Sequence, residues 1–369
     1  MAIYLAQIFI IFIFSVILHP VKNNQRRKWF FIISFFVLTI VSGIRGYSVG
    51  ADTKVYVQLY NNINAISINN GRYEAGFIIY LKALHRISKN PSFMLFISSV
   101  FCIGTFCFFT YKYSKKPTIS LVLYILLGAY FSQMNIMRQT ISLSITMLGF
   151  MLILDDSIKD NRTFFRICVS AILIIFATSF HTIVFVAFVP WILVIRQGFN
   201  EDKSNLSMRH AFFTTLLLGI LVYLGYSIIL RIVTIALPSY AHYFYGRWSD
   251  SNHFGSLFKA LISITFLTVG AIIFRGKKLT NVQRFSIIML GLEIIFHILS
   301  MRMEIWGRIA GLFGIYTYII WIPEFINEIK VKNNRIIVEI SIVGFSFAYM
   351  LIVLIFRPEW SLVVPYVIK

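Results

Sequence analysis

Four short segments of the sequence place arginine, carboxylate and histidine side chains beside flexible or helix-breaking residues. In the first segment, Arg45 and Asp52 flank Gly46 and Gly50. Glycines at these positions let backbone N–H groups approach an anion, as in phosphate-binding turns. An arginine can stabilise a leaving phosphate, and a carboxylate can take a proton from a hydroxyl. The structural alternative is that Arg45 reaches to the membrane interface while Asp52 caps the next helix.

The other three segments hold Tyr73 and Glu74, Arg138 and Gln139, and His181. Arg138 stands at the start of an apolar stretch, where a helix N-terminus adds to its attraction for anions. Glu74 precedes a short apolar stretch, and desolvation there would raise its pKa towards the range of a general base. His181 ordinarily titrates near neutral pH. The structural alternatives are a first-turn acid, an arginine at the interface and a histidine bonded to a carbonyl.

Three of these side chains are candidates for the base that accepts a proton. A neighbouring Arg45 would keep Asp52 ionised and lower its basicity. We therefore rank Glu74 and His181 ahead of Asp52, and expect Asp52 to position its loop or to hold an acceptor hydroxyl. Glu293 and His297 are four residues apart on one helical face, where we expect a buried structural pair.

The composition indicates that these residues belong to a membrane protein. Of 369 residues, 58% are hydrophobic and only 13% charged, more apolar area than one soluble core could bury. The net charge of +20 is carried by short cationic clusters between apolar runs, which favours a topological role and not nucleic-acid binding. The three cysteines lie within apolar runs and predict neither disulfides nor a metal site.

Apolar stretches long enough to cross the bilayer predict an all-α, polytopic integral membrane protein with about twelve transmembrane helices. They cover residues 2–18, 29–44, 91–111, 118–135, 139–154, 165–180, 182–195, 211–237, 257–274, 285–300, 309–326 and 336–356. The sixth and seventh are separated only near His181 and could form one broken helix. We expect a single transmembrane domain over residues 1–369.

The distribution of lysine and arginine orients these spans. Alternate connections each carry at least three of these cations, which places them in the cytoplasm and both termini outside. The long connection, residues 45–90, is then extracytoplasmic, and its short apolar stretch predicts an interfacial or re-entrant helix. The candidate charged residues gather towards that same face.

In the four segments described above, the sequence resembles the EpsG/Wzy-type bacterial polysaccharide polymerases. The resemblance rests on Arg45-Gly-Tyr-Ser-Val-Gly-Ala-Asp52-Thr53 with Tyr56, Tyr73-Glu74-Ala-Gly76-Phe, Met137-Arg138-Gln139 and Ser179-Phe180-His181-Thr182. The family usually has Thr where Ala51 stands and often Pro where Ala75 stands, and neither change removes a reactive group. The second half of the chain is similar to the family in hydropathy alone.

The resemblance implies a glycosyltransferase in the bacterial inner membrane whose active site faces the extracytoplasmic side. Its donor and acceptor would both be glycans linked to undecaprenyl pyrophosphate, with no metal and no cofactor. A chain-length regulator protein is a further partner that the resemblance suggests. The catalytic candidates are Glu74, His181 and Asp52. The candidates for binding pyrophosphate or glycan are Arg45, Tyr73, Arg138, Gln139, Arg231, Arg247, Arg302 and Arg308.

Three other classes of membrane protein fit parts of the pattern. A flippase for the same lipid-linked glycan needs charge through both leaflets, whereas the charges here gather near one face. An O-acyltransferase needs a site open to the cytoplasm, for which the short cytoplasmic loops offer little. A glycan ligase would use the same donor and differ only in its acceptor.

Overall fold

The computed structural model describes residues 1–68, 71–154, 163–199, 208–236 and 253–368, and every regular element in these ranges is helical. The prediction of an all-α fold is therefore confirmed. The first half of the chain contains α1 (Ala2–Leu18), α2 (Asn24–Gly43), α3 (Thr53–Asn61), η1 (Ile63–Ala65), α4 (Ala75–Ile87), α5 (Pro91–Tyr113), α6 (Pro117–Leu126), α7 (Ala129–Asn135), α8 (Met137–Leu154) and α9 (Thr163–Thr178). It is followed by η2 (Thr182–Ala187), α10 (Phe188–Phe199), α11 (Met208–Leu224), α12 (Tyr226–Ala236), α14 (His253–Ile273), α15 (Asn281–Ser300), α16 (Ile305–Tyr316), η5 (Thr317–Trp321), α17 (Ile322–Glu328), α18 (Lys332–Phe356) and η6 (Pro358–Trp360).

Each predicted apolar stretch falls on a helix or on consecutive helices. Among the described residues, six helices are long and apolar enough to cross a membrane, and two bent pairs raise this number to eight. The bends are 53° between α6 and α7 and 74° at the junction of α11 and α12. Three further apolar helices are shorter. The chain is thus a polytopic membrane protein, while the number of twelve spans stays a prediction.

The helices group into two compact units. Unit 1 comprises Met1–Trp191 and Val331–Lys369, and unit 2 comprises Ile192–Lys330. The prediction of one transmembrane domain stays a prediction beside this grouping. The sixth and seventh apolar stretches are separate elements, because α9 ends at Thr178 and His181 has an extended backbone before η2.

In unit 1, α2 packs on α5, α5 on α8, and α8 on α9. Small polar side chains bond these helices together, as is usual where lipid removes the hydrophobic drive for helix association. The Ser142 hydroxyl donates to the carbonyl of Ala177 over 2.7 Å, and the Ser170 hydroxyl donates to that of Gly149 over 2.8 Å. These two bonds fix α8 against α9, the helices that lead to Arg138 and His181.

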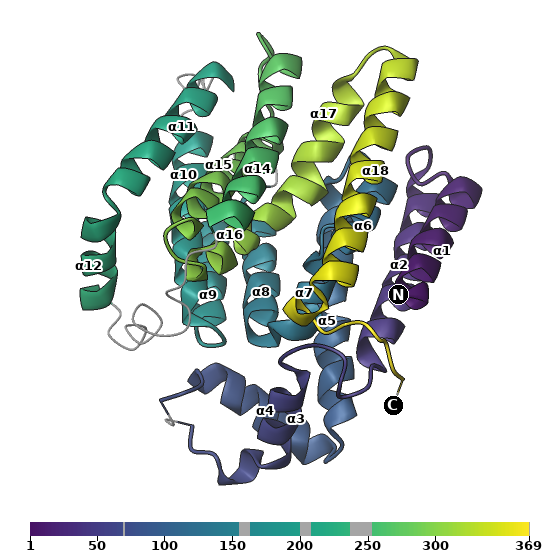
Figure 1. Ribbon diagram of the computed structural model, residues 1–369, viewed down its shortest axis with the longest axis vertical. Coiled ribbons are helices and arrows are strands. Elements are labelled where there is room, and N and C mark those ends of the chain that lie inside the picture. The colour runs from purple at the N-terminus through teal and green to yellow at the C-terminus, as the bar shows by residue number, and fades with distance from the viewer. Residues whose placement is uncertain (69–70, 155–162, 200–207, 237–252, 369) are drawn as a thin grey trace. The chain divides into compact units, whose positions relative to one another are not determined.

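The segment between the second and third apolar stretches folds as α3, η1 and α4. Figure 1 shows α3 and α4 together, and both contact α5. The apolar stretch predicted to be too short to span forms α4, whose Phe77, Ile78 and Leu81 are fully buried. The side of the membrane on which this segment lies stays a prediction.

The two ends of the chain meet in unit 1. The Tyr4 hydroxyl, near the start of α1, donates to the carbonyl of Val363, beyond α18, over 2.9 Å. Figure 1 marks both termini near these helices. The start of α1 therefore lies beside the segment that follows α18.

Unit 2 is centred on α15, which packs on α11, α14 and α16. The Glu293 carboxylate of α15 is buried and accepts hydrogen bonds from the hydroxyls of Ser263, over 2.9 Å, and Thr317, over 2.6 Å. His297 Nε2 lies 3.9 Å from Glu293 Oε1. The predicted pair is therefore buried, but hydroxyl groups supply the close hydrogen bonds to this carboxylate.

Candidate active site

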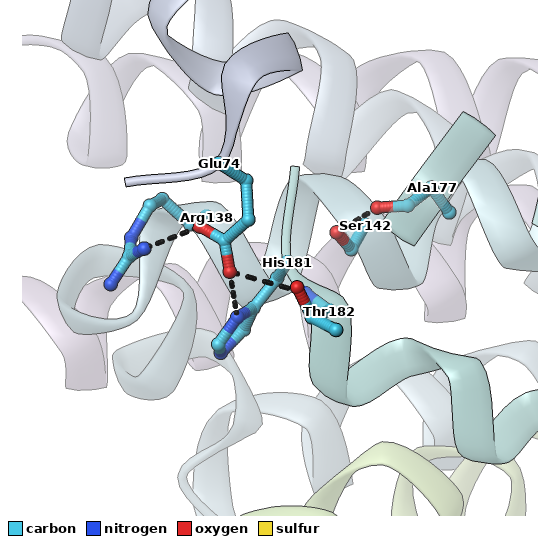
Figure 2. A network of polar contacts seen from close by, with 6 residues as sticks. All are labelled: Glu74, Arg138, Ser142, Ala177, His181 and Thr182. Atoms are coloured by element: carbon cyan, nitrogen blue, oxygen red, sulfur yellow. Dashed lines mark hydrogen bonds and ion pairs between the residues drawn. The ribbon is translucent and has the colours of Figure 1, made fainter. Parts of the chain in front are cut away.

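Glu74 joins three elements of unit 1 through its carboxylate. It is the N-cap residue of α4, yet its side chain makes no capping bond. Its Oε2 atom accepts a hydrogen bond from Arg138 Nη1 over 2.6 Å. Its Oε1 atom lies 3.0 Å from His181 Nδ1 and accepts the N–H of Thr182 over 3.1 Å. Figure 2 shows Arg138 and His181 converging on this carboxylate, so three sequence candidates share one site.

A close approach between α4 and the end of α9 brings these residues together. A Cβ atom on Gly76 would lie 2.2 Å from Ser179 Oγ and 2.8 Å from the Ser179 carbonyl oxygen. Only glycine allows this contact without a shift of the connection. The N–H of Phe77 donates to the same Ser179 carbonyl over 3.3 Å. The first turn of α4, which carries Glu74, is thereby held beside the segment that carries His181.

Aromatic side chains surround the Arg138 guanidinium. It lies 5.0 Å from the ring centroid of Tyr73 and 6.0 Å from that of Phe77. Burial raises the pKa of Tyr56, an effect opposed by the charge of Arg138 and by a hydrogen bond with it. Gln139 is buried beside Arg138 in the first turn of α8. Cation–π contacts and the bond to Glu74 therefore fix the direction of this arginine.

The electrostatics of the site keep Glu74 ionised. Burial alone would raise its pKa, but the hydrogen bond with His181 and the charge of Arg138 outweigh burial and lower the pKa to about 2. The prediction of a raised pKa for Glu74 is therefore wrong, because it considered desolvation and omitted two partners distant in the sequence. A carboxylate that stays ionised and accepts three hydrogen bonds is a weak base at neutral pH.

The contact with Glu74 determines which ring nitrogen carries the hydrogen when the His181 side chain is neutral. An ionised carboxylate can only accept hydrogen bonds, so the hydrogen of the His181–Glu74 contact lies on Nδ1. The other ring nitrogen, Nε2, then carries the lone pair that can accept a proton. His181 is partly exposed, at 15% of its side-chain surface. The arrangement can orient an imidazole base and stabilise it after protonation.

Arg45 is buried and directs its donors at the main chain. It is 3% exposed, and its guanidinium donates to the carbonyl of Ser42 and, over 3.2 Å, to that of Met134. Among the described residues, the Nε atoms of Arg45 and Arg138 are buried and have no hydrogen-bond partner. A buried donor of this kind could bind an anionic oxygen. Binding of pyrophosphate by either arginine stays a prediction.

The loop of Gly46 and Gly50 does not present these two glycine N–H groups to an anion. The Gly46 N–H donates to the Val367 carbonyl over 2.7 Å, and the Gly50 N–H donates to that of Leu362 over 2.8 Å. The expectation of a phosphate-binding turn at these glycines is therefore wrong. Asp52 is the N-cap residue of α3, but its side chain makes no capping bond.

The remaining candidates lie in unit 2 or outside the described residues. In unit 2, Arg231 is exposed on α12, Arg308 is half-buried on α16, and the Arg302 guanidinium lies 4.2 Å from the ring centroid of Tyr223. Arg247 lies outside the described residues. Among those described, no group of three or more His, Cys, Asp or Glu side chains is placed to hold a metal ion.

Two members of the network had no role assigned from the sequence. Tyr56 follows Asp52 by four positions, a spacing that puts both on one helical face and could have indicated its part in the site. Thr182 contributes its backbone N–H to Glu74, and such a group leaves no trace in the residue type. The sequence indicated the charged groups of the site, but not the tyrosine and the backbone N–H that interact with them.

The fold and the site define an all-helical membrane protein with a partly buried Glu–Arg–His network. The model of the EpsG family matches residues 28–368, and the chain belongs to the EpsG family. This is a family of Wzy-type polysaccharide polymerases, and the chain has a role of that type. No curated protein and no solved structure matches it.

Proposed function

We propose that this chain is a glycosyltransferase that joins oligosaccharide repeat units linked to undecaprenyl pyrophosphate into a polysaccharide. One lipid-linked glycan is the donor and another is the acceptor, and neither a metal nor a cofactor takes part. The observation that carries this proposal is the contact of Glu74 with both His181 Nδ1 and Arg138 Nη1. It supplies a proton acceptor and a cation at one place.

In the proposed reaction, a hydroxyl oxygen of the acceptor sugar attacks the anomeric carbon of the donor sugar. The hydroxyl proton passes to His181 Nε2, and the bond from the anomeric carbon to the pyrophosphate oxygen breaks. The electron pair of that bond leaves with undecaprenyl pyrophosphate. Arg138 stabilises the charge that develops on this leaving group, and ionised Glu74 stabilises the imidazolium.

This assignment changes the order of the base candidates. His181 becomes the proposed base because its neutral ring carries a lone pair on Nε2. The low pKa of Glu74 makes that carboxylate a poor base, and we assign it the role of orienting His181. Asp52 keeps its proposed role of positioning the loop or holding the acceptor hydroxyl. Its charge acts on Tyr56, which in turn interacts with Arg138.

We place the reaction at the extracytoplasmic face of the bacterial inner membrane. Neither ATP nor nucleotide sugars are present there, so the donor must arrive already activated, and a lipid pyrophosphate sugar is such a donor. Cysteine labelling tests this side. A probe at Asn62→Cys should react in intact cells, and one at Lys277→Cys only after permeabilisation. The reverse pattern would contradict the proposed orientation.

The donor is tested by incubating the purified protein with short lipid-linked repeat units, a chelator and no nucleotide. We expect a ladder of products and one undecaprenyl pyrophosphate released for each new glycosidic bond. A requirement for a nucleotide sugar, or release of the lipid monophosphate, would contradict the proposed donor chemistry. A single transfer to a different acceptor would indicate a ligase, and translocation without new bonds a flippase.

A further inference from the structure

The end of the chain returns to the loop that carries the first sequence motif. We call residues 358–368 the C-terminal strap and residues 45–52 the motif loop. Backbone N–H groups of the motif loop donate to carbonyl groups of the strap. These bonds are Gly46 to Val367 at 2.7 Å, Gly50 to Leu362 at 2.8 Å and Ala51 to Ser361 at 3.2 Å. They are main-chain bonds, so they depend little on the side chains of the strap.

Two tyrosines fix the strap to the helices of unit 1. The buried Tyr4 hydroxyl donates to the Val363 carbonyl over 2.9 Å, and the Tyr366 hydroxyl donates to the Val41 carbonyl over 2.7 Å. The rings of Tyr4 and Tyr366 meet edge to face, with centroids 5.9 Å apart. Val363 is fully buried. The strap is therefore packed into unit 1 and is held by one hydrogen bond from Tyr4 and one from Tyr366.

Beside the strap, the motif loop also meets the residues that lead into α8. Asn135 is buried, and its side-chain oxygen accepts the N–H of Ala51 while its amide donates to the Phe131 carbonyl over 3.0 Å. Gly50 has a φ of +100°, and a Cβ atom there would lie 3.2 Å from Asn135 Oδ1. Glycine is required at this approach. Asn135 stands three positions before Arg138.

We propose that the C-terminal strap and Asn135 are positioning elements of the active site. Together they hold the motif loop, and through it Asp52 and α3, in register with the start of α8. Tyr56 of α3 interacts with Arg138, so a displaced loop changes where the Arg138 charge lies relative to His181. This inference rests on the proposed function for its effect on catalysis, but the docking of the strap does not.

A disulfide tests the docking directly. A Cβ atom on Gly46 would lie 3.5 Å from Val367 Cβ, a separation that suits a disulfide after a small shift of the Val367 carbonyl. The pair Gly46→Cys and Val367→Cys is placed in protein whose three native cysteines are replaced by serine, with each single cysteine as control. We expect the pair to form a cross-link on oxidation, measured in the absence of substrate. We also expect the cross-linked protein to have at least half of the activity that it has after reduction of the disulfide.

Two results would overturn the proposal. Absence of the cross-link would show that the strap does not lie on the motif loop. A cross-link that lowers activity more than tenfold, with recovery on reduction, would show that the strap must leave the loop during the reaction. Since the cross-link is scored without substrate, its failure is distinct from an absence of polymerase activity, which would count against the proposed function.

A pH–rate profile separates positioning from simple support of the fold. Asn135→Ala removes the acceptor for Ala51, and we expect kcat to fall about tenfold in protein that stays monodisperse. As the loop and Arg138 shift away from His181, protonated imidazole becomes more favoured and the acid limb of the profile moves to higher pH. Asn62→Ala, at the exposed end of α3, should change neither. An unmoved acid limb in Asn135→Ala would overturn its positioning role.

Discussion

The Nδ1 atom of His181 lies 3.0 Å from Oε1 of Glu74, a carboxylate 107 positions earlier in the chain. The contact joins the start of α4 to the connection between α9 and η2 (Figure 2). It fixes the orientation of the imidazole and, in the neutral ring, places the hydrogen on Nδ1 and the lone pair on Nε2. Substitutions of Glu74, of its partner Arg138 and of His181 test the role of each in the proposed reaction.

Glu74→Gln separates an orienting carboxylate from a base. We expect the rate to fall about 10- to 100-fold, because the amide no longer stabilises the imidazolium. For the same reason, the acid limb of the pH–rate profile should move to lower pH. The measurement is a pH–rate profile at saturating substrate. Disappearance of the acid limb, with a loss as large as in His181→Ala, would assign the base to Glu74.

The low pKa of Glu74 also predicts how stability depends on pH. Its pKa falls from the ordinary 4.5 to about 2 in the folded protein, so the ionised side chain stabilises the fold above pH 4.5 by about 3 kcal/mol. This contribution is lost as the pH falls from 4.5 towards 2. Melting temperatures of wild type and Glu74→Gln should therefore differ most above pH 5 and converge only as the pH approaches 2.

Glu328 provides the matched control for that experiment. It forms a more exposed ion pair with Lys277 at 2.6 Å, and such pairs are worth about 0–1 kcal/mol. Glu328→Gln should lower the melting temperature little at any pH. An equal loss in the two variants, or a gap between wild type and Glu74→Gln that has already closed at pH 4, would contradict the inferred state of Glu74.

Arg138→Lys tests the guanidinium of the site. Lysine keeps the charge but loses the planar fork that can bond Glu74 and a phosphate oxygen together, so we expect activity to fall at least about tenfold. Arg72→Lys is the matched control, because Arg72 also lies over the Tyr73 ring, at 5.3 Å. Rates are measured per amount of inserted protein. Unchanged polymer length and rate in Arg138→Lys would argue against its role.

Gly76→Ala tests the close approach that holds α4 beside His181. The added methyl group would collide with Ser179, and overpacking of this kind costs about 1–3 kcal/mol. We expect a lower melting temperature and reduced activity. Gly104→Ala should be tolerated, because its methyl group meets only Phe35 at 3.4 Å within a helix. Equal behaviour of the two variants would show that the Gly76 contact is not needed.

Hydropathy predicted where the helices lie but not where they bend. The stretch 118–135 reads as one continuous apolar run, yet it divides into α6 and α7 at Gly128, which has a φ of +82°. A left-handed glycine interrupts the helical bonding without any change in hydrophobicity. The number of spans cannot be counted from apolar length alone for the same reason.

The residue types of the site could be predicted, whereas their partners could not. Glu74 and His181 are chemically conspicuous, but neither residue type indicates that the two side chains meet. Without that contact the sequence predicts the wrong direction for the pKa of Glu74. The C-terminal strap is harder still to foresee, because its bonds to Gly46 and Gly50 are made by the main chain.

The most direct test of the account is the rate of glycosidic bond formation by purified His181→Ala protein supplied with a defined lipid-linked repeat unit. His85→Ala is the matched control, because His85 is a buried histidine of α4 that contacts Lys89 and Tyr60. We predict that the His181 variant is slower than wild type by about 10²- to 10⁴-fold, while the His85 variant stays within about twofold. A product ladder formed by folded His181→Ala at the wild-type rate would contradict the account.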